Sequence, residues 1–202
     1  MAFDEVHGRI RQKGEIEDAA TAALKKWIRY YLGIVAEQHE FSAIAAPKRF
    51  AVVSEFERFP EDDLPVVIVM SEQAISVERK GDGYYNAIYP LSVAVVVAAA
   101  SGPTARTMAH LYGAAVRALF EHNQSIGDGI TVVSWEGDGS LTVGSAKART
   151  TVAVEENFTV RMTNIVSDLA GPALAQPPED PPTEWPEITS TEVDATHLAD
   201  ES

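Results

Sequence analysis

PLSVAVVVAAASGPTARTMAHLYGAAVRALFEH, residues 90–122, decides how this chain folds. It opens with an uncharged run, residues 91–100, which is about half as long as the roughly 20 residues that a helix needs to cross a bilayer. The valines in this run favour an extended backbone, and a continuous apolar run is typical of a strand that is covered on both faces. We therefore expect a buried central strand here and no membrane association.

The residues after this run predict a helix. Ser101 offers a side-chain oxygen to the free amides at a helix start, and Pro103 fits the first turn. The expected buried stripe comprises Met108, Leu111, Tyr112, Ala115, Val116 and Leu119, and the opposite face carries Arg106, His110, Arg117 and Glu121. A strand, turn and helix can cradle a phosphate. The turn lacks both the G-x-x-x-x-G-K-[ST] and the G-x-G-x-x-G patterns, so phosphate binding is disfavoured.

The sequence on either side of this stretch predicts one more helix and several strands. Apolar residues recur at three- and four-residue spacing across residues 15–38, which predicts an amphipathic helix whose bases Lys25, Lys26 and Arg29 face solvent. The expected apolar stripe comprises Ile16, Ala20, Ala23, Leu24, Trp27, Tyr31, Ile34 and Val35. Short β-branched runs follow, and Gly-Asp-Gly at 81–83 and at 137–139 predicts two hairpins. The expected fold is α+β: a two-layer domain with a mixed, largely antiparallel sheet, two helices on one face and β-hairpin extensions.

Charge divides the chain into two parts. Residues 176–202 hold eight acids and five prolines without any Lys or Arg, so this segment carries −8 of the formal net charge of −14 and leaves −6 on residues 1–175. We expect a folded domain over 1–172 and an acidic, extended or disordered tail over 173–202. Trp185 and Ile188 are potential docking anchors in that tail; a tail that contacts nothing is the alternative. An acidic body also disfavours tight non-specific binding to nucleic acid.

The sequence contains no recognisable catalytic or metal-binding motif. The chain has no cysteine, and its five histidines (His7, His39, His110, His122 and His197) are far apart in the sequence. G-x-S-x-G is absent, and the adjacent carboxylates Glu155 and Glu156 point to opposite faces if they lie on a strand. Glu156 is also the residue that breaks the apolar alternation of residues 152–162. The sequence therefore predicts no enzyme, no cofactor and no metal, and a module that acts through its surface.

One resemblance gives this surface a context. Tyr84, Tyr85 and Tyr89 before the buried strand, followed by Ala109, Tyr112, Val116, Arg117 and Leu119, resemble the tail terminator proteins of long-tailed bacteriophages, especially those that infect actinobacteria. The likeness covers roughly residues 15–165. It implies a virion protein, assembled in the host cytoplasm, that forms a homohexameric ring at the head-proximal end of the tail tube. Its expected partners are the major tail tube protein and the head-to-tail connector, and DNA passes through the lumen without specific binding.

Members of this family have no catalytic residues to carry over, so function is expected to be spread over surfaces. The regions that we single out as contacts are the hairpin around Asp138 and the helix face of Arg106, His110, Arg117 and Glu121. Simple solvation of that helix face is the alternative. Two other functions stay open: another connector or tail tube subunit, and a small cytoplasmic ligand-binding domain or enzyme with Tyr112 and His110 near its cleft.

Overall fold

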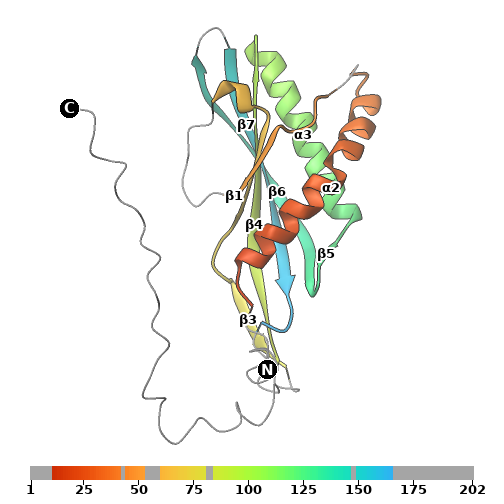
Figure 1. Cartoon of the computed structure of the whole chain (residues 1–202), viewed down its shortest axis with the longest axis vertical. Helices are drawn as coiled ribbons and strands as arrows, with labels where there is room; N and C mark the ends of the chain where they lie inside the picture. The colour runs from red at the N-terminus through yellow and green to blue at the C-terminus, as the bar shows by residue number, and fades with distance from the viewer. Residues whose placement is uncertain (1–10, 42–43, 53–59, 81–83, 147–148, 166–202) are drawn as a thin grey trace, which may run out of the picture.

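The computed structural model describes residues 11–41, 44–52, 60–80, 84–146 and 149–165 (Figure 1). The C-terminal tail, residues 173–202, lies outside these residues. Two helices, one 3-10 turn and seven strands follow one another along the described chain: α2 (Gly14–Gln38), β1 (Arg49–Val52), η1 (Glu61–Asp63), β2 (Val66–Ser71), β3 (Ser76–Arg79), β4 (Tyr85–Ala99), α3 (Gly102–His122), β5 (Ser125–Gly127), β6 (Ile130–Ala146) and β7 (Arg149–Met162).

The strands form one mixed, largely antiparallel sheet in the order β1-β2-β4-β7-β6-β5. Only the β1–β2 pair is parallel among the described strands. On one edge β4 pairs with β7 from Ala87 to Ala99, and on its other edge it pairs first with β3 and then with β2. Residues 91–99 of the run thus belong to the central strand that the sequence predicts, and the α+β fold class is confirmed.

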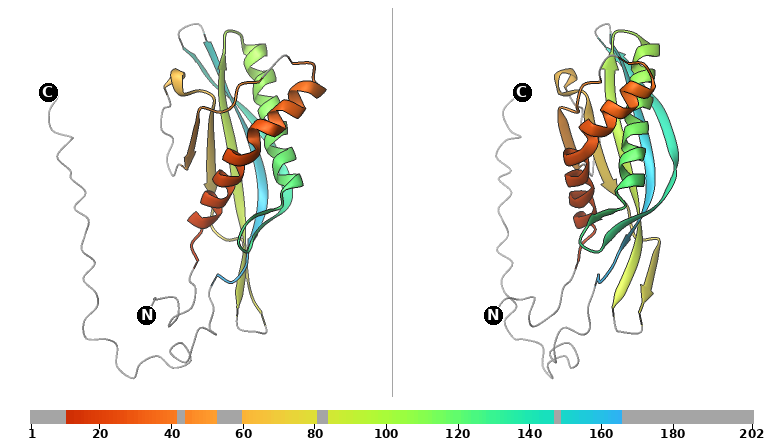
Figure 2. Two further views of the ribbon diagram at one scale, coloured as in Figure 1. Left: turned by 45° about the vertical axis from the view of Figure 1, so that its right-hand side comes forward. Right: turned by 90° about the vertical axis from the view of Figure 1, so that its right-hand side faces the viewer.

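Both helices pack on the same face of the sheet (Figure 2). Leu91, Val93, Val95 and Val97 of β4 are buried beneath them, which is the period-two pattern of a strand with one face toward a core. On the other face Ala94, Val96 and Ala98 are only half-buried and pack against a small second cluster around Val66 and Ile68. The run is therefore covered on both faces, but the second cover is partial.

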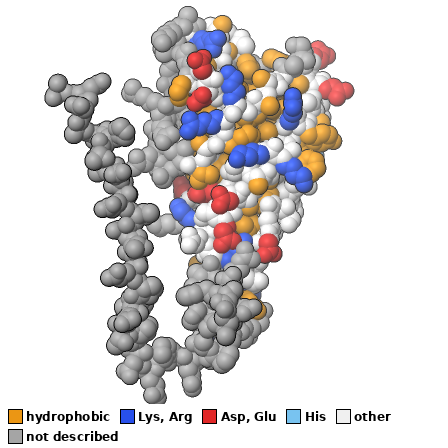
Figure 3. Space-filling model, viewed as in Figure 1, with side chains coloured by type: hydrophobic (Ala, Val, Ile, Leu, Met, Phe, Trp, Pro, Cys, Tyr) orange, Lys and Arg blue, Asp and Glu red, His pale blue; other side chains and the backbone are white. Residues whose placement is uncertain are grey.

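The helix boundaries follow the predicted chemistry. The Ser101 side chain accepts a hydrogen bond from the Thr104 amide, and Pro103 lies in the first turn of α3. In α2 the bases Lys25, Lys26 and Arg29 are exposed, as predicted. Basic side chains gather over the middle of this helix, whereas acidic ones lie toward its two ends (Figure 3).

The hairpin predicted at Gly137-Asp138-Gly139 is wrong. Strand β6 runs through these residues without turning, and its register shifts between Trp135 and Gly137, where Gly137 has φ +141°. A glycine serves a β-bulge inside a strand as well as it serves a turn, so the triplet does not distinguish the two. The chain reverses later, between Ala146 and Arg149, which face each other at the ends of β6 and β7.

The hairpin predicted at 81–83 is supported by the antiparallel pairing of β3 and β4, in which Arg79 faces Tyr85. The three residues of the Gly-Asp-Gly triplet themselves lie outside the described residues.

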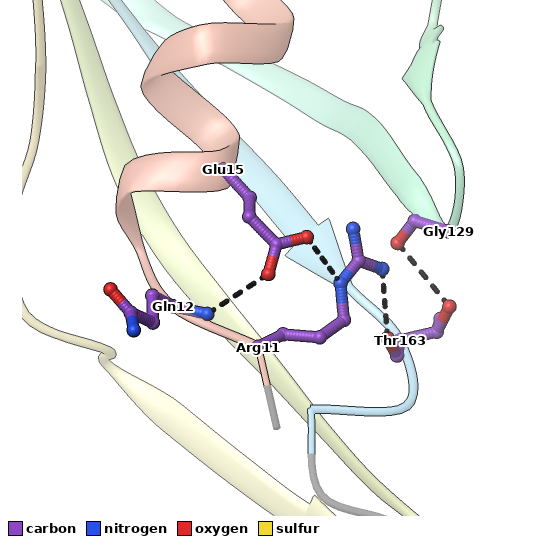
Figure 4. Close-up of polar contacts among 5 residues, drawn as sticks. All are labelled: Arg11, Gln12, Glu15, Gly129 and Thr163. Atoms are coloured by element: carbon purple, nitrogen blue, oxygen red, sulfur yellow. Dashed lines mark hydrogen bonds and ion pairs between the residues drawn. The ribbon is translucent and has the colours of Figure 1, made fainter. Parts of the chain in front are cut away.

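Buried Arg11 ties together three parts of the chain that are distant in sequence (Figure 4). Its Nε donates to Glu15 Oε2 at 2.9 Å, and its Nη1 donates to the carbonyl of Thr163 at 3.2 Å. The Thr163 amide donates to the carbonyl of Gly129 at 2.8 Å, so the end of β7 and the β5–β6 turn join the same network. Gly129 has φ +62°, and a Cβ there would lie 2.5 Å from Thr163 Oγ1. The sequence gives no sign that Arg11 is buried.

We expect Arg11→Met to lower the free energy of unfolding by about 2 kcal/mol, because the Thr163 carbonyl loses a charged donor in a buried site. Urea denaturation followed by circular dichroism measures this loss. Arg106→Met is the matched control, since Arg106 is exposed and its loss should change stability by less than about 0.5 kcal/mol. Equal effects of the two substitutions would contradict the role given to Arg11.

Candidate functional site

A buried carboxylate lies between helix α3 and the sheet. Glu156 is 2% exposed, and it occupies an inward position of β7 between Val154 and Phe158. Its Oε2 accepts a hydrogen bond of 2.7 Å from Trp135 Nε1 of β6. On the helix, Gly113 leaves the space that the carboxylate needs, because a Cβ at this position would lie 2.6 Å from Glu156 Oε1.

A cation lies near this buried group and lowers its pKa. The Arg117 guanidinium carbon lies 4.6 Å from the centre of the Trp135 ring, a distance typical of a cation–π contact. Asp138 faces Glu156 across the β6–β7 ladder. Four side chains from three elements therefore meet here, and we call Arg117, Trp135, Asp138 and Glu156 the α3–β6 cluster.

Burial raises the pKa of Glu156 from its ordinary value of 4.5 to about 7. The Trp135 hydrogen bond and the nearby Arg117 charge act on this pKa in the opposite direction, and Asp138 adds to the rise because it is a like charge. Loss of solvation outweighs the attraction of one nearby cation. The raised pKa places the protonation change of this buried carboxyl near neutral pH, close to the Arg117 charge.

The cluster combines the Glu156 carboxyl, whose pKa is raised, with the Arg117 guanidinium, which lies against the Trp135 ring. The described residues contain no group of three or more His, Asp or Glu side chains placed to hold a metal ion. Glu156 itself accepts a hydrogen bond from an indole, which cannot exchange protons as a histidine or a second carboxyl does. The chemistry that the cluster supports is recognition of a partner with a carboxylate or phosphate group, through the donors of Arg117.

Gly113→Ala should destabilise the protein by about 1–2 kcal/mol, since the new methyl group pushes against Glu156 Oε1 and against Val154 Cγ2, which is 3.1 Å away. Gly33→Ala in α2 is the matched control: no atom lies within 4 Å of its Cβ, so helix propensity alone should stabilise the protein by up to about 1 kcal/mol. Thermal unfolding measures both. Repeating Gly113→Ala in a Glu156→Ala background should reduce its cost, and an undiminished cost would show that the carboxylate is not the obstacle.

The structure brings together two of the five residues singled out from the sequence. Arg117 and Asp138 both belong to the α3–β6 cluster. Arg106, His110 and Glu121 share the predicted face of α3 with Arg117, and all three are exposed. Arg106 lies eleven residues before Arg117, which corresponds to about 16 Å along the helix, so it belongs to a separate part of that face.

Sequence reasoning missed the centre of this site. Glu156 was visible as the break in the alternation of β7, but its partners Trp135 and Gly113 come from two other elements. The pairing of Trp135 with Phe158 places the indole beside the inward row of β7. No local pattern in the sequence predicts that register, because the β6 strand carries three bulges.

The surface of the described residues is hollowed at places away from the cluster. One hollow, of about 390 Å³, lies at the start of α3 between Arg106 and Thr150. Another, of about 940 Å³, lies beside the end of β2 and is lined by Lys13, Glu17, Glu72 and Glu155 among others. There the Glu17 carboxylate accepts from the Ser71 amide at 2.9 Å and Lys13 donates to the Ser71 carbonyl at 3.0 Å, so these charges anchor α2 to the edge of β2.

The cleft expected near Tyr112 and His110 does not form in the described part of the chain. Tyr112 is fully buried and its hydroxyl donates to the carbonyl of Ala45, and this burial raises its pKa. His110 is exposed on a different face of α3. His110 and Tyr112 are two residues apart on the helix, so their side chains point about 200° apart and cannot line one pocket.

No family model matches the chain, and no curated protein matches it. Neither described helix is long and apolar enough to cross a membrane.

Proposed function

We propose that this protein is a ring-forming tail terminator of a long-tailed bacteriophage, which caps the head-proximal end of the tail tube and joins it to the connector. The proposal starts from the resemblance at Tyr84, Tyr85 and Tyr89 and along α3. Ala109, Tyr112, Val116 and Leu119 of α3 are buried in the core, so the resemblance lies mostly in packing residues. The predicted six-fold stoichiometry comes from that resemblance alone.

The observation that carries the proposal is the open edge of β6. Strand β5 pairs with β6 only at Ile130 and Thr131, and the Val132 amide bonds to Gln124. From residue 134 to residue 146 no other described strand lies along the edge of β6 that faces away from β7. A long edge with unpaired backbone groups readily accepts another chain.

The opposite edge of the sheet is different, which suits a ring. It ends in β1, a strand of four residues that is parallel to β2. A ring needs a head-to-tail interface between two unlike surfaces, whereas a two-fold dimer joins the same surface twice. A sheet whose two edges differ in length and direction supplies such a pair.

The hairpin of β3 and β4 offers a further contact. It extends beyond the body of the sheet and helices (Figure 2), and it carries the exposed apolar side chains of Ile75 and Val77. Apolar side chains on a projecting hairpin are suited to insertion into a neighbouring subunit or into the tube.

The state of assembly tests the proposal. We expect the purified protein to form rings, in solution or on contact with tail tubes, visible by negative-stain electron microscopy as one cap at one end of each tube. Decoration along the whole tube would instead indicate a tube subunit. Monomers that do not bind tubes would overturn the proposal. A small molecule that raises the melting temperature by several degrees would favour the ligand-binding alternative.

A further inference from the structure

The middle of helix α2 carries an unusual combination of charge and aromatic surface. Residues 19–36 contain no acidic side chain, and their three bases Lys25, Lys26 and Arg29 are exposed. Trp27, which is 36% exposed, lies between Lys26 and Arg29, and Tyr30, which is 61% exposed, follows Arg29. We call these five residues the α2 patch; it is the blue and orange area over the centre of α2 in Figure 3.

The bases of the α2 patch have no acidic partner among the described residues. Lys26 Nζ lies 4.8 Å from the centre of the Trp27 ring, and Lys25 Nζ lies 5.9 Å from the centre of the Phe50 ring. The described ion pairs elsewhere on the surface join Arg49 to Asp63 and Lys80 to Glu78. The patch is therefore a positive and partly apolar surface on a protein whose net charge is strongly negative.

The same chain contains a segment with the opposite properties. Residues 176–202 carry eight acids and no base, and Trp185 and Ile188 lie among the acids Glu184 and Glu187. An acidic segment with apolar anchors matches a surface that combines amines with exposed rings. Its five prolines limit the conformations available before binding, which lowers the entropy lost on docking.

The chain length allows the two to meet within one molecule. The carbonyl of Ile165 accepts from the Arg11 amide at 2.9 Å, so the last described residue lies beside a point three residues before the start of α2. From Gly14 to Lys25 and Tyr30 is about 17–24 Å along the helix. The eleven residues from Ile165 to Gln176 span up to about 36 Å when extended, so the acidic segment can lie over the patch.

We propose that the α2 patch binds the acidic segment 176–202 of the same chain, with the carboxylates on Lys25, Lys26 and Arg29 and with Trp185 beside Trp27 and Tyr30. This inference is independent of the proposed function, because it depends on neither ring formation nor tube binding. The contact neutralises part of the negative charge of the segment and covers the two exposed rings.

Paramagnetic broadening in the full-length protein tests this contact. The chain has no cysteine, so Thr183→Cys provides one attachment point for a nitroxide spin label two residues from Trp185. We expect the amide signals of residues 25–30 to broaden. We also expect the broadening to fall at about 1 M NaCl, where the Debye length is about 3 Å. Unchanged signals at low salt would overturn the proposal.

Charge reversal gives the matched control. Lys25→Glu, Lys26→Glu and Arg29→Glu together should abolish the broadening, whereas Lys80→Glu, Arg106→Glu and Arg161→Glu change the net charge equally at exposed sites elsewhere and should leave it intact. If both triple variants lost the broadening equally, the tail would be attracted by overall charge and not by the α2 patch, which would overturn the proposal. Mixing isotope-labelled chains with spin-labelled chains distinguishes a contact within one chain from a contact between two chains. Broadening that arises only between different chains would mean that the occupant is a second copy, which also contradicts the proposal.

Discussion

Glu156→Gln should stabilise the protein by about 3 kcal/mol at pH 8 and leave its stability almost unchanged at pH 4. In the folded protein the pKa of Glu156 is about 7, whereas in the unfolded chain it is near the ordinary value of 4.5. The contribution of this group to stability is therefore complete below pH 4.5, and it is lost as the pH rises to about 7. Over that interval the loss is about 1.4 kcal/mol per pH unit. Glutamine keeps an oxygen acceptor for Trp135 and carries no charge, so it removes the loss.

Urea denaturation at several pH values measures this effect as the difference between the two proteins. The difference should grow from pH 4.5 to pH 7 and stay constant above pH 7. Glu155→Gln is the matched control, because Glu155 is the adjacent residue, lies on the other face of the sheet and is half-exposed. It should change stability by less than about 0.5 kcal/mol. Parallel pH curves for the wild-type protein and Glu156→Gln would show that the carboxylate is not held neutral by burial.

Val133→Lys combined with Ser140→Lys should prevent ring formation while the subunit stays folded. Both positions are exposed on β6: Ser140 lies within the open edge, and Val133 directly precedes it at the register shift between Val132 and Ser134. Lysines on an edge strand oppose the approach of a second strand, since pairing would bring their charges against another backbone and remove them from water. We expect assemblies to dissociate to monomers and tube binding to fall at least tenfold, which corresponds to about 1.4 kcal/mol.

Ala22→Lys with Gln38→Lys adds the same charge on α2, at exposed positions away from both edges of the sheet. This control should assemble as the wild-type protein does. Sedimentation velocity and tube co-sedimentation compare the two double variants, and a melting temperature within a few degrees of the wild type shows that each is folded. Normal assembly of the β6 variant would exclude the β6 edge as the seam between subunits.

The parts of the fold that the sequence predicted are those determined by local chemistry. Ser101 and Pro103 mark the start of α3, and the alternation of Leu91, Val93, Val95 and Val97 marks the face of β4 that lies on the core. In α2 the three- and four-residue spacing placed Ile16, Ala20 and Leu24 in the core. The prediction from spacing was wrong at Trp27, which belongs to the apolar stripe of α2 and yet is 36% exposed. The stripe is wider than the part of α2 that packs on the core.

The parts that could not be predicted depend on pairing between distant segments. Gly137 permits both a turn and a bulge, and only the long ladder with β7 decides that β6 continues through it. Likewise, Glu156 is tolerated in the core because Gly113 makes room for it and Trp135 donates to it, and these residues lie 43 and 21 positions away. Arg11 is buried for the same reason, since its acceptor at Thr163 is 152 residues away in sequence.

Electron cryomicroscopy of tail tubes incubated with this protein tests both the proposed function and the proposed contact between subunits. We expect a single ring at one end of each tube, in which the open edge of β6 in each subunit lies against the neighbouring subunit. Tubes without a cap, or a ring whose subunits leave residues 134–146 of β6 facing solvent, would contradict this expectation.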